Sequence, residues 1–228
     1  MTGTAAIIPA KDEGDRIGAT VAAVLALPGV DLVVVVDDGS DDETGRVAKA
    51  AGARVVRHSH NRGKAAAMES GAHAVRLLDL DGEKPRHLLF LDADLGETAR
   101  TAAPLIEPVA AGEADMTIAV FVTRVKLGGH GFVVRLAREG VERATGWTPA
   151  QPLNGQRCLT RAAFEAARPL ARGFGVETGL TIDLLRKGFR VREVPVEMAH
   201  RATGTDWKAQ VHRARQFRDV ARALLSRR

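Results

Sequence analysis

The sequence contains no tyrosine, few other aromatic residues and a single cysteine. Because Cys158 has no partner for an internal disulfide, a reducing compartment is favoured. The chain has no uncharged run long enough to span a bilayer, and the apolar run Ala5 to Pro9 is too short for a signal peptide and is followed directly by charged residues. These absences predict a protein of the cytoplasm.

The charges are unevenly distributed along the chain. Residues 1–120 contain 12 Lys and Arg against 19 Asp and Glu, a net charge of −7, whereas residues 121–228 contain 21 against 9, a net charge of +12. The scarcity of aromatic residues and the lack of a zinc or helix-turn-helix signature argue against a nucleic-acid partner. The basic half fits a phosphate-bearing substrate, an anionic lipid surface or a solvated basic face.

The first half alternates short apolar segments with segments of helical spacing. This pattern predicts strands at residues 4–9, 31–38, 53–58 and 87–94, and helices at residues 15–27, 42–51 and 62–78. Strands that alternate with helices indicate the α/β class, with a mostly parallel sheet flanked by helices, and we expect residues 1–228 to form a single domain. Ligands of such sheets bind beyond the carboxyl ends of the strands.

Acidic residues follow three of the predicted strands, with Glu13 after the first, Asp37 and Asp38 after the second, and Asp92 and Asp94 after the fourth. In an extended segment residues two apart point the same way, so Asp92 and Asp94 are expected to face one ligand, and Ala93 keeps the backbone open. Paired carboxylates favour Mg²⁺ or Mn²⁺. The alternative is a pair of solvated acids at the end of a strand.

Other residues at this edge indicate a nucleotide. Gly63 and Lys64 open a helix whose N–H groups and ammonium suit a phosphate or a carbonyl group. A carboxylate such as Asp38 can accept a base N–H, although the acids of this turn can also cap the following helix. The chain has neither a G-x-G-x-x-G fingerprint nor a P-loop, which argues against dinucleotide and P-loop sites.

Four motifs, IIPAKDE, VVVVDDGSDD, NRGKAAAMESGA and LLFLDADLG, resemble in order and spacing the nucleotide-sugar-binding half of family-2-like glycosyltransferases. The resemblance covers about residues 4 to 99 and implies the Rossmann-like GT-A fold, with a donor half at about residues 1–120 and an acceptor half at about residues 121–228. The positions expected to bind the nucleotide sugar, most simply a UDP-sugar, are Pro9, Ala10, Glu13, Asp38, Gly63, Lys64, Asp92 and Ala93. The resemblance places Asp94 on a Mg²⁺ or Mn²⁺ ion that bridges the diphosphate, with Asp92 near the ribose or the metal.

The second half is similar to the acceptor half of glucosyl-3-phosphoglycerate synthases and related bacterial transferases, through GGHGFVVRLAREGVERATGW, QPLNGQRCLTRAAFE, GFGVETGLTIDLL and VPVEMAHRATG. This resemblance implies that His200 is a metal ligand and that Glu177 lies close to the reacting sugar. Glu177 can instead pair with the helix N-terminus. Gly129, Arg157 and Arg201 are the candidates for acceptor binding. The alternative for the two arginines, and the commoner one, is an exposed side chain that binds no ligand.

The acceptor is less defined than the donor. The phosphoglycerate-type enzymes carry Arg and Thr after the two glycines, where this chain has His130, Gly131 and Phe132, so either a small phosphorylated acceptor or a polyprenyl phosphate fits. Residues 132–147 and 207–225 form basic amphipathic patterns that suit a peripheral contact at the inner face of the membrane, or helices packed on the domain with one wet face. Family likeness also allows a homodimer.

We therefore expect a metal-dependent glycosyltransferase in which Asp94 acts through the metal and Glu177 acts as a base or stabilises the sugar. Both inverting and retaining stereochemistry fit the resemblances. The alternatives are a haloacid dehalogenase-like phosphatase, in which Asp92 is the nucleophile, a sugar-nucleotidyltransferase, and a nucleotide-sugar-binding regulator without catalysis. The phosphatase motif expects Thr or Val at Gly96, and the nucleotidyltransferase expects a Gly-rich basic loop after the first strand, which this chain lacks.

Overall fold

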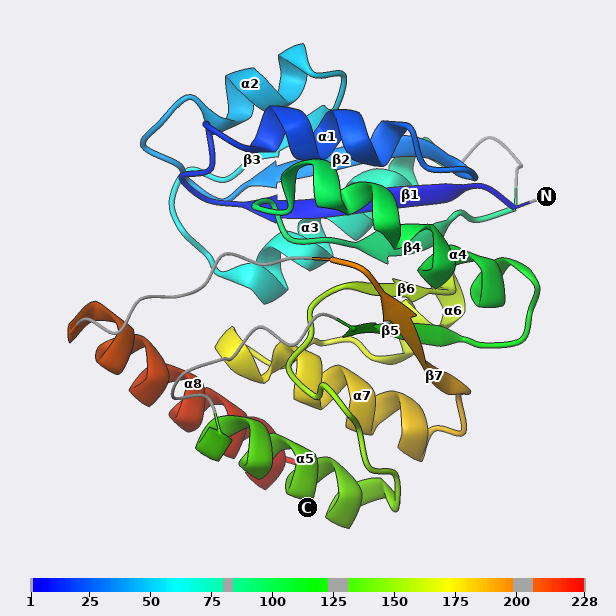
Figure 1. The fold of residues 1–228 in the computed structure, drawn as a ribbon, viewed down its shortest axis with the longest axis vertical. Helices are drawn as coiled ribbons and strands as arrows, with labels where there is room; N and C mark the ends of the chain where they lie inside the picture. The colour runs from blue at the N-terminus through cyan, green and yellow to red at the C-terminus, as the bar shows by residue number, and fades with distance from the viewer. Residues whose placement is uncertain (1, 80–83, 123–130, 199–206, 228) are drawn as a thin grey trace.

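The computed structural model describes residues 2–79, 84–122, 131–198 and 207–227, the last of these with side chains from Arg215 onward. In this part of the chain, a seven-stranded sheet with the order β3-β2-β1-β4-β6-β5-β7 forms the centre of the molecule (Figure 1). The strands are β1 (Thr4–Ala10), β2 (Val30–Asp37), β3 (Arg54–Arg57), β4 (His87–Phe90), β5 (Met116–Phe121), β6 (Arg157–Leu159) and β7 (Val191–Val196). The helices are α1 (Ile17–Leu25), α2 (Thr44–Ala50), α3 (Lys64–Leu78), α4 (Ala103–Ala110), α5 (Gly131–Thr145), α6 (Arg161–Ala166), α7 (Val176–Arg186) and α8 (Trp207–Leu225), with 3-10 turns η1 (Gly96–Ala102) and η2 (Gly173–Gly175).

The sheet is mostly parallel, as the alternating pattern predicts. β1 pairs in parallel with β2 and β4, β2 with β3, and β5 with β7. The short strand β6 is antiparallel to both of its neighbours, β4 and β5, and it joins the first half of the chain to the second. The α/β class with a mostly parallel sheet is therefore confirmed.

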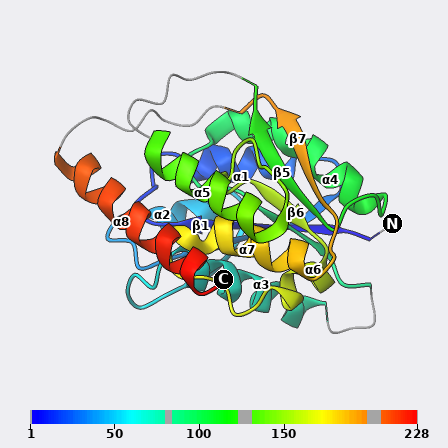
Figure 2. The ribbon, with the colours of Figure 1, turned by 90° about the horizontal axis from the view of Figure 1, so that it is seen from below.

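Helices cover both faces of the sheet. On one face α1, α2, η1 and α4 pack in a core that includes Ile8 and Val35, and on the other face α3, α6 and α7 pack in a core that includes Ile7 and Val34 (Figures 1 and 2). Neighbouring residues of one strand enter opposite cores because side chains alternate along a strand. Burial on both faces explains why β1 and β2 are continuous apolar runs rather than alternating ones.

A third layer consists of α5 and α8, which pack against each other and against α7 (Figures 1 and 2). Their small core contains Val133, Ala137 and Val220, and the rings of Phe132 and Phe217 stack with centroids 5.5 Å apart. The two predicted amphipathic segments are thus helices packed on the domain. Within the described residues, no helix has both the length and the apolar character needed to cross a bilayer.

Candidate active site

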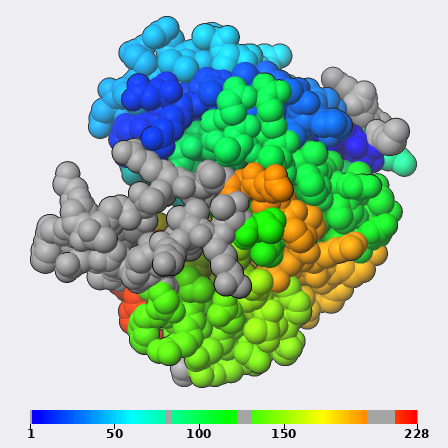
Figure 3. Space-filling model, in the orientation of Figure 1, coloured from blue at the N-terminus to red at the C-terminus, as the bar shows by residue number. Residues whose placement is uncertain are grey.

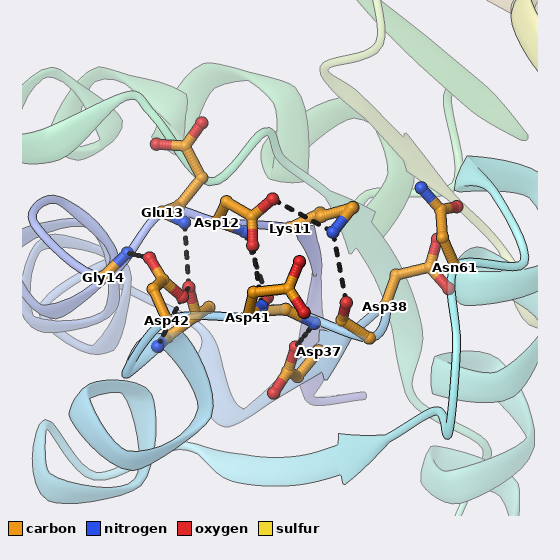
Figure 4. A network of polar contacts seen from close by, with 12 residues as sticks. Lys11, Asp12, Glu13, Gly14, Asp37, Asp38, Asp41, Asp42 and Asn61 are labelled. Atoms are coloured by element: carbon orange, nitrogen blue, oxygen red, sulfur yellow. Dashed lines mark hydrogen bonds and ion pairs between the residues drawn. The ribbon is translucent and has the colours of Figure 1, made fainter.

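The loops after β1 and β2 are joined at the carboxyl ends of these strands by hydrogen bonds (Figure 4). The backbone N–H of Asp12 donates to Ser40 Oγ at 3.0 Å, the N–H of Glu13 donates to Thr44 Oγ1 at 2.8 Å, and the N–H of Asp41 donates to Asp12 Oδ1 at 2.9 Å. The carboxylate of Glu13 points away from this network (Figure 4). The segment after β1, which is predicted to frame the nucleoside, is therefore held by hydrogen bonds of its backbone. The side chain of Glu13 takes no part in these bonds.

Pro9 and Ala10 end β1 at this edge, where Ala10 lies opposite Asp37 in β2. The carbonyl of Ala10 accepts a hydrogen bond from the N–H of Asp38 at 2.8 Å, which continues the pairing one residue beyond β2. In the same turn Asp42 Oδ1 accepts from the N–H of Thr44, the first residue of α2, at 2.9 Å, whereas the N-cap residue of α2 is Glu43, which makes no side-chain capping bond. Pro9 and Ala10 thus lie where the resemblance expects the nucleoside, and their role stays a prediction.

Asp38 organises the next loop. Its Oδ1 accepts from the N–H of Arg62 at 2.8 Å and contacts His58 Nδ1 at 2.7 Å, and its Oδ2 accepts from the N–H of Gly63 at 2.7 Å. Burial alone would raise the pKa of Asp38, but the hydrogen bonds from Arg62, His58 and Gly63 outweigh it, so the pKa of this carboxyl is lowered. The structure thus gives Asp38 a structural task besides the predicted contact with a base.

Lys64 is the first residue of α3, after Gly63, whose φ of +86° favours glycine. Its Nζ lies 2.8 Å from Asp92 Oδ1 and 3.0 Å from Glu177 Oε1. Burial alone would lower the pKa of Lys64, but the charges of Asp92 and Glu177 more than offset it and hold the pKa above its ordinary value. The Lys64 ammonium therefore stays charged and links an acid of the first half to an acid of the second half.

The acids of the D-x-D motif do not lie on an extended strand. β4 ends at Phe90, and Ala93 and Asp94 form a turn, so the predicted strand to residue 94 and its alternation argument were wrong. The turn is held by the buried hydroxyl of Thr20 in α1, which donates to the carbonyl of Ala93 and accepts from the N–H of Gly96, both at 2.8 Å. Tertiary contact with α1 thus overrides the strand pattern.

Asp92 is also held by the second half of the chain. Its Oδ2 accepts a hydrogen bond from Gln156 Nε2 at 2.8 Å, while its Oδ1 contacts Lys64. Gln156 is buried, and it precedes the antiparallel strand β6, which runs beside β4. The pairing of β6 with β4 therefore brings residues 92 and 156 together.

Glu177 is the second residue of α7 and is only 8% exposed. The prediction that Arg157 binds an acceptor phosphate is wrong, because its side chain is 1% exposed and its guanidinium donates to protein groups. These are the carbonyls of Asn154 at 2.8 Å and Glu177 at 3.0 Å, and Thr181 Oγ1 at 2.8 Å. Burial lowers the pKa of Arg157 to about 10, so it remains charged at neutral pH. Arg157 thus supports the start of α7.

Of the predicted metal ligands, Asp92 and Asp94 are among the described residues and His200 is not. Among the described residues, no three His, Cys, Asp or Glu side chains are grouped so that they could hold a metal ion. Asp94 lies in the turn after β4 and supplies hard carboxylate oxygens, the donors that Mg²⁺ and Mn²⁺ prefer. His200, Gly129 and Arg201 lie outside the described residues. The chemistry of Asp94 fits a divalent cation that takes most of its ligands from a diphosphate and water.

The sequence reasoning missed three residues, namely Thr20, Gly155 and Gln156. No signal in a single sequence connects a threonine in the first helix with a turn 73 residues later. The segment around Gly155 and Gln156 was part of a recognised motif, but the pairing of β6 with β4, which gives it a place in the site, cannot be read from that motif.

The mostly parallel sheet and the acidic loops at its edge agree with the GT-A fold that the sequence motifs imply. The family model described as glycosyl transferase family 2 matches residues 5–160. The chain therefore belongs to glycosyltransferase family 2 and is a glycosyltransferase.

The relatives include proteins with named activities. The chain is 30% identical over 195 residues to the glucosyl-3-phosphoglycerate synthase of Mycolicibacterium paratuberculosis, covering 78% of this chain and 58% of the relative. It is 29% identical over 178 residues to the glycosyltransferase AglJ of Haloferax volcanii, covering 76% of this chain and 56% of the relative. The chain thus spans somewhat more than half of the length of these two relatives.

The fold is similar to solved structures of the Mycobacterium tuberculosis glucosyl-3-phosphoglycerate synthase. Its complex with Mn²⁺, UDP and phosphoglyceric acid matches with a TM-score of 0.80 and 26% sequence identity, covering 99% of this chain and 78% of that chain. The same enzyme has been solved with Mg²⁺ and UDP. The predicted family and the GT-A fold are confirmed, and the phosphatase and nucleotidyltransferase alternatives find no support.

Proposed function

We propose that this chain transfers a sugar from a UDP-sugar to a phosphate-bearing acceptor, with Mg²⁺ or Mn²⁺ as the cofactor. One related enzyme, solved with UDP and each of these ions, supports the donor and the cofactor. The observation that carries the proposal is the position of Lys64, whose ammonium contacts Asp92 from the first half and Glu177 from the second. We assign the donor to about residues 1–120 and the acceptor to about residues 121–228, which appear as two regions of one face in Figure 3.

The proposed roles follow from the charges that develop during the reaction. Cleavage of the bond between the anomeric carbon and the diphosphate oxygen leaves negative charge on UDP and positive charge on the sugar. Asp94, with Asp92 and His200 as the further predicted ligands, would hold the divalent cation, which would neutralise the charge of the diphosphate. Lys64 keeps a fixed positive charge beside Asp92, and Glu177 stabilises the sugar or accepts the proton of a hydroxyl acceptor. An ionised phosphate acceptor requires no such base.

The acceptor carries an anionic group in this proposal because the second half of the chain has a net charge of +12. One relative is named glucosyl-3-phosphoglycerate synthase, and the Mycobacterium tuberculosis enzyme of that name was solved with phosphoglyceric acid. Both facts favour a small phosphorylated acid. A polyprenyl phosphate at a membrane surface presents the same anionic group for binding, although its phosphate oxygen, rather than a hydroxyl, would then attack the sugar. Two assays with UDP-glucose distinguish these acceptors, one with 3-phosphoglycerate in solution and one with polyprenyl phosphate in vesicles. If neither acceptor yields a glycosylated product, a phosphate-bearing acceptor is contradicted.

Donor binding can be tested by thermal shift with UDP, GDP and their glucose, N-acetylglucosamine and mannose conjugates, with and without Mn²⁺. A nucleotide at about 100 times its Kd stabilises the fold by about 2.7 kcal/mol. For a domain of this size we expect the Tm to rise by about 5–10 °C. The rise should be largest with a uridine nucleotide plus Mn²⁺ and should be reversed by EDTA.

Asp94→Ala should abolish the part of this shift that depends on Mn²⁺, because the predicted metal ligand is removed. Asp41→Ala, at an exposed acid of a neighbouring loop, is the matched control. An Asp94→Ala protein that keeps the full manganese-dependent shift would refute the metal assignment.

A further inference from the structure

The segment 154–156, directly before β6, is buried and internally bonded. The N–H of Gln156 donates to Asn154 Oδ1 at 2.9 Å, and Asn154 Nδ2 donates to Gln151 Oε1 at 3.1 Å. The carbonyl of Asn154 accepts from Arg157 Nε at 2.8 Å. With these bonds the segment forms a rigid support rather than a mobile loop.

This support touches the Lys64 cluster, defined here as Lys64, Asp92 and Glu177. A Cβ atom built on Gly155 would lie 2.3 Å from Lys64 Nζ, 3.3 Å from Asp92 Oδ1 and 3.4 Å from Glu177 Oε1. All three polar groups of the cluster therefore surround the one position that has no side chain. Gly155 does not adopt a positive φ, so its backbone would accept alanine and only the space is lacking.

Gln156 acts on the same cluster from the other side of Asp92. Its Nε2 donates to Asp92 Oδ2 at 2.8 Å, so the two oxygens of this carboxylate are held by different groups, the ammonium of Lys64 and a neutral amide. The cluster already contains two carboxylates for one ammonium. A neutral donor fixes the direction of Asp92 without changing that charge balance.

We propose that Gly155 and Gln156 are positioning residues for the transfer reaction: Gly155 leaves the space that the Lys64 ammonium occupies between Asp92 and Glu177, and Gln156 fixes the Asp92 carboxylate. The inference rests on the proposed function, because it concerns how the donor and acceptor halves are aligned for that chemistry. Alignment errors of about 1 Å cost on the order of 100-fold in rate.

Gly155→Ala tests the space beside Lys64. We expect kcat for UDP-sugar turnover to fall by about 30- to 100-fold and the KM for the donor to rise by a much smaller factor, since the loops after β1 and β2 are untouched. Gly18→Ala in α1 is the matched control, because its Cβ would meet only a methyl group of Val47, at 3.1 Å, and kcat should be unchanged. An unchanged kcat in Gly155→Ala, or a loss confined to KM, would overturn the role of Gly155.

Gln156→Met tests the hydrogen bond to Asp92 with a side chain of similar length and no N–H donor. It also serves if Gly155→Ala fails to fold. We expect kcat to fall about 10-fold or more with a donor KM near that of the wild type. Gln156→Glu should retain less activity than Gln156→Met, because it places a third carboxylate in the cluster. Wild-type kcat in both Gln156 variants would overturn the role of Gln156.

Failure of the inference and failure of the proposed function give different results. If the wild-type chain transfers sugar and the Gly155 and Gln156 variants do so equally well, only the inference is wrong. If the wild-type chain shows manganese-dependent UDP binding by calorimetry but no turnover with any acceptor or with water, the transfer function fails and the inference fails with it.

Discussion

At the residue scale, Asp38 shows how one side chain can serve both the fold and a ligand. Its carboxylate accepts from two backbone N–H groups of the loop before α3 and contacts His58, which in turn contacts Ser70 Oγ at 2.9 Å. A carboxylate that receives several donors has a lowered pKa, as found for Asp38. The loop that presents Lys64 is therefore tied to the residue expected to meet the base.

Asp38→Asn should lower the free energy of unfolding at pH 7 by about 2 kcal/mol, because an amide cannot accept from all of these donors. A carboxyl whose folded pKa is lowered contributes stability above its unfolded pKa of about 3.9, and this contribution is lost as the pH falls through the lower folded value. The difference between Asp38→Asn and wild type should therefore shrink below about pH 4. Urea denaturation at pH 7 and in acid measures it.

Asp41→Asn is the control for this prediction, since Asp41 is an exposed acid of the same loop. Its unfolding free energy should match that of the wild type at both pH values. A difference between Asp38→Asn and wild type that is independent of pH would show that the carboxylate charge is not what stabilises the loop.

At the scale of elements, the order of strands and helices from β1 to β4 followed from the pattern of apolar residues, but the end of the fourth strand did not. The run HLLFLDAD reads as a strand to its end, whereas β4 stops at Phe90. The chain leaves the sheet because Thr20 in α1 bonds both sides of the turn that follows. The position of the D-x-D acids is thus a property of the packing of α1 on that turn.

Thr20→Val should lower the free energy of unfolding by about 1–2 kcal/mol, because it leaves the buried carbonyl of Ala93 and the N–H of Gly96 without their partner at nearly constant volume. It should also weaken manganese-dependent binding of UDP, since the turn carries Asp94. Thr20→Ser keeps the hydroxyl and should bind UDP and Mn²⁺ as the wild type does. Calorimetric titration of the three proteins tests this, and equal affinity in Thr20→Val would refute a positioning role for Thr20.

At the scale of the whole molecule, the two halves carry opposite net charge and meet through β6 and the Lys64 cluster. The first half has a net charge of −7 and the second a net charge of +12. A divalent cation makes an anionic donor compatible with the acidic half, while the basic half attracts an anionic acceptor directly.

The KM of a phosphorylated acceptor should therefore rise with ionic strength, by about 3- to 10-fold between about 50 and 300 mM salt, because the Debye length shortens over this range. The KM of the UDP-sugar, measured at saturating Mn²⁺, should change less. Steady-state kinetics over a salt series, with a matched series in sucrose for osmotic effects, compares the two constants. If the two KM values depend equally on salt, the idea that the basic half attracts the acceptor electrostatically is contradicted.

The sequence by itself determined the α/β order, the acidic edge and the family, because buried parallel strands require continuous apolar runs and the loops that follow them carry the polar residues. Only the tertiary structure decided that Arg157 is an internal support, that the D-x-D acids lie in a turn, and that Gly155 and Gln156 adjoin Lys64. These outcomes depend on which strands pair and which helices pack across the sheet, and contacts between residues far apart in the chain leave no periodic signal in a single sequence.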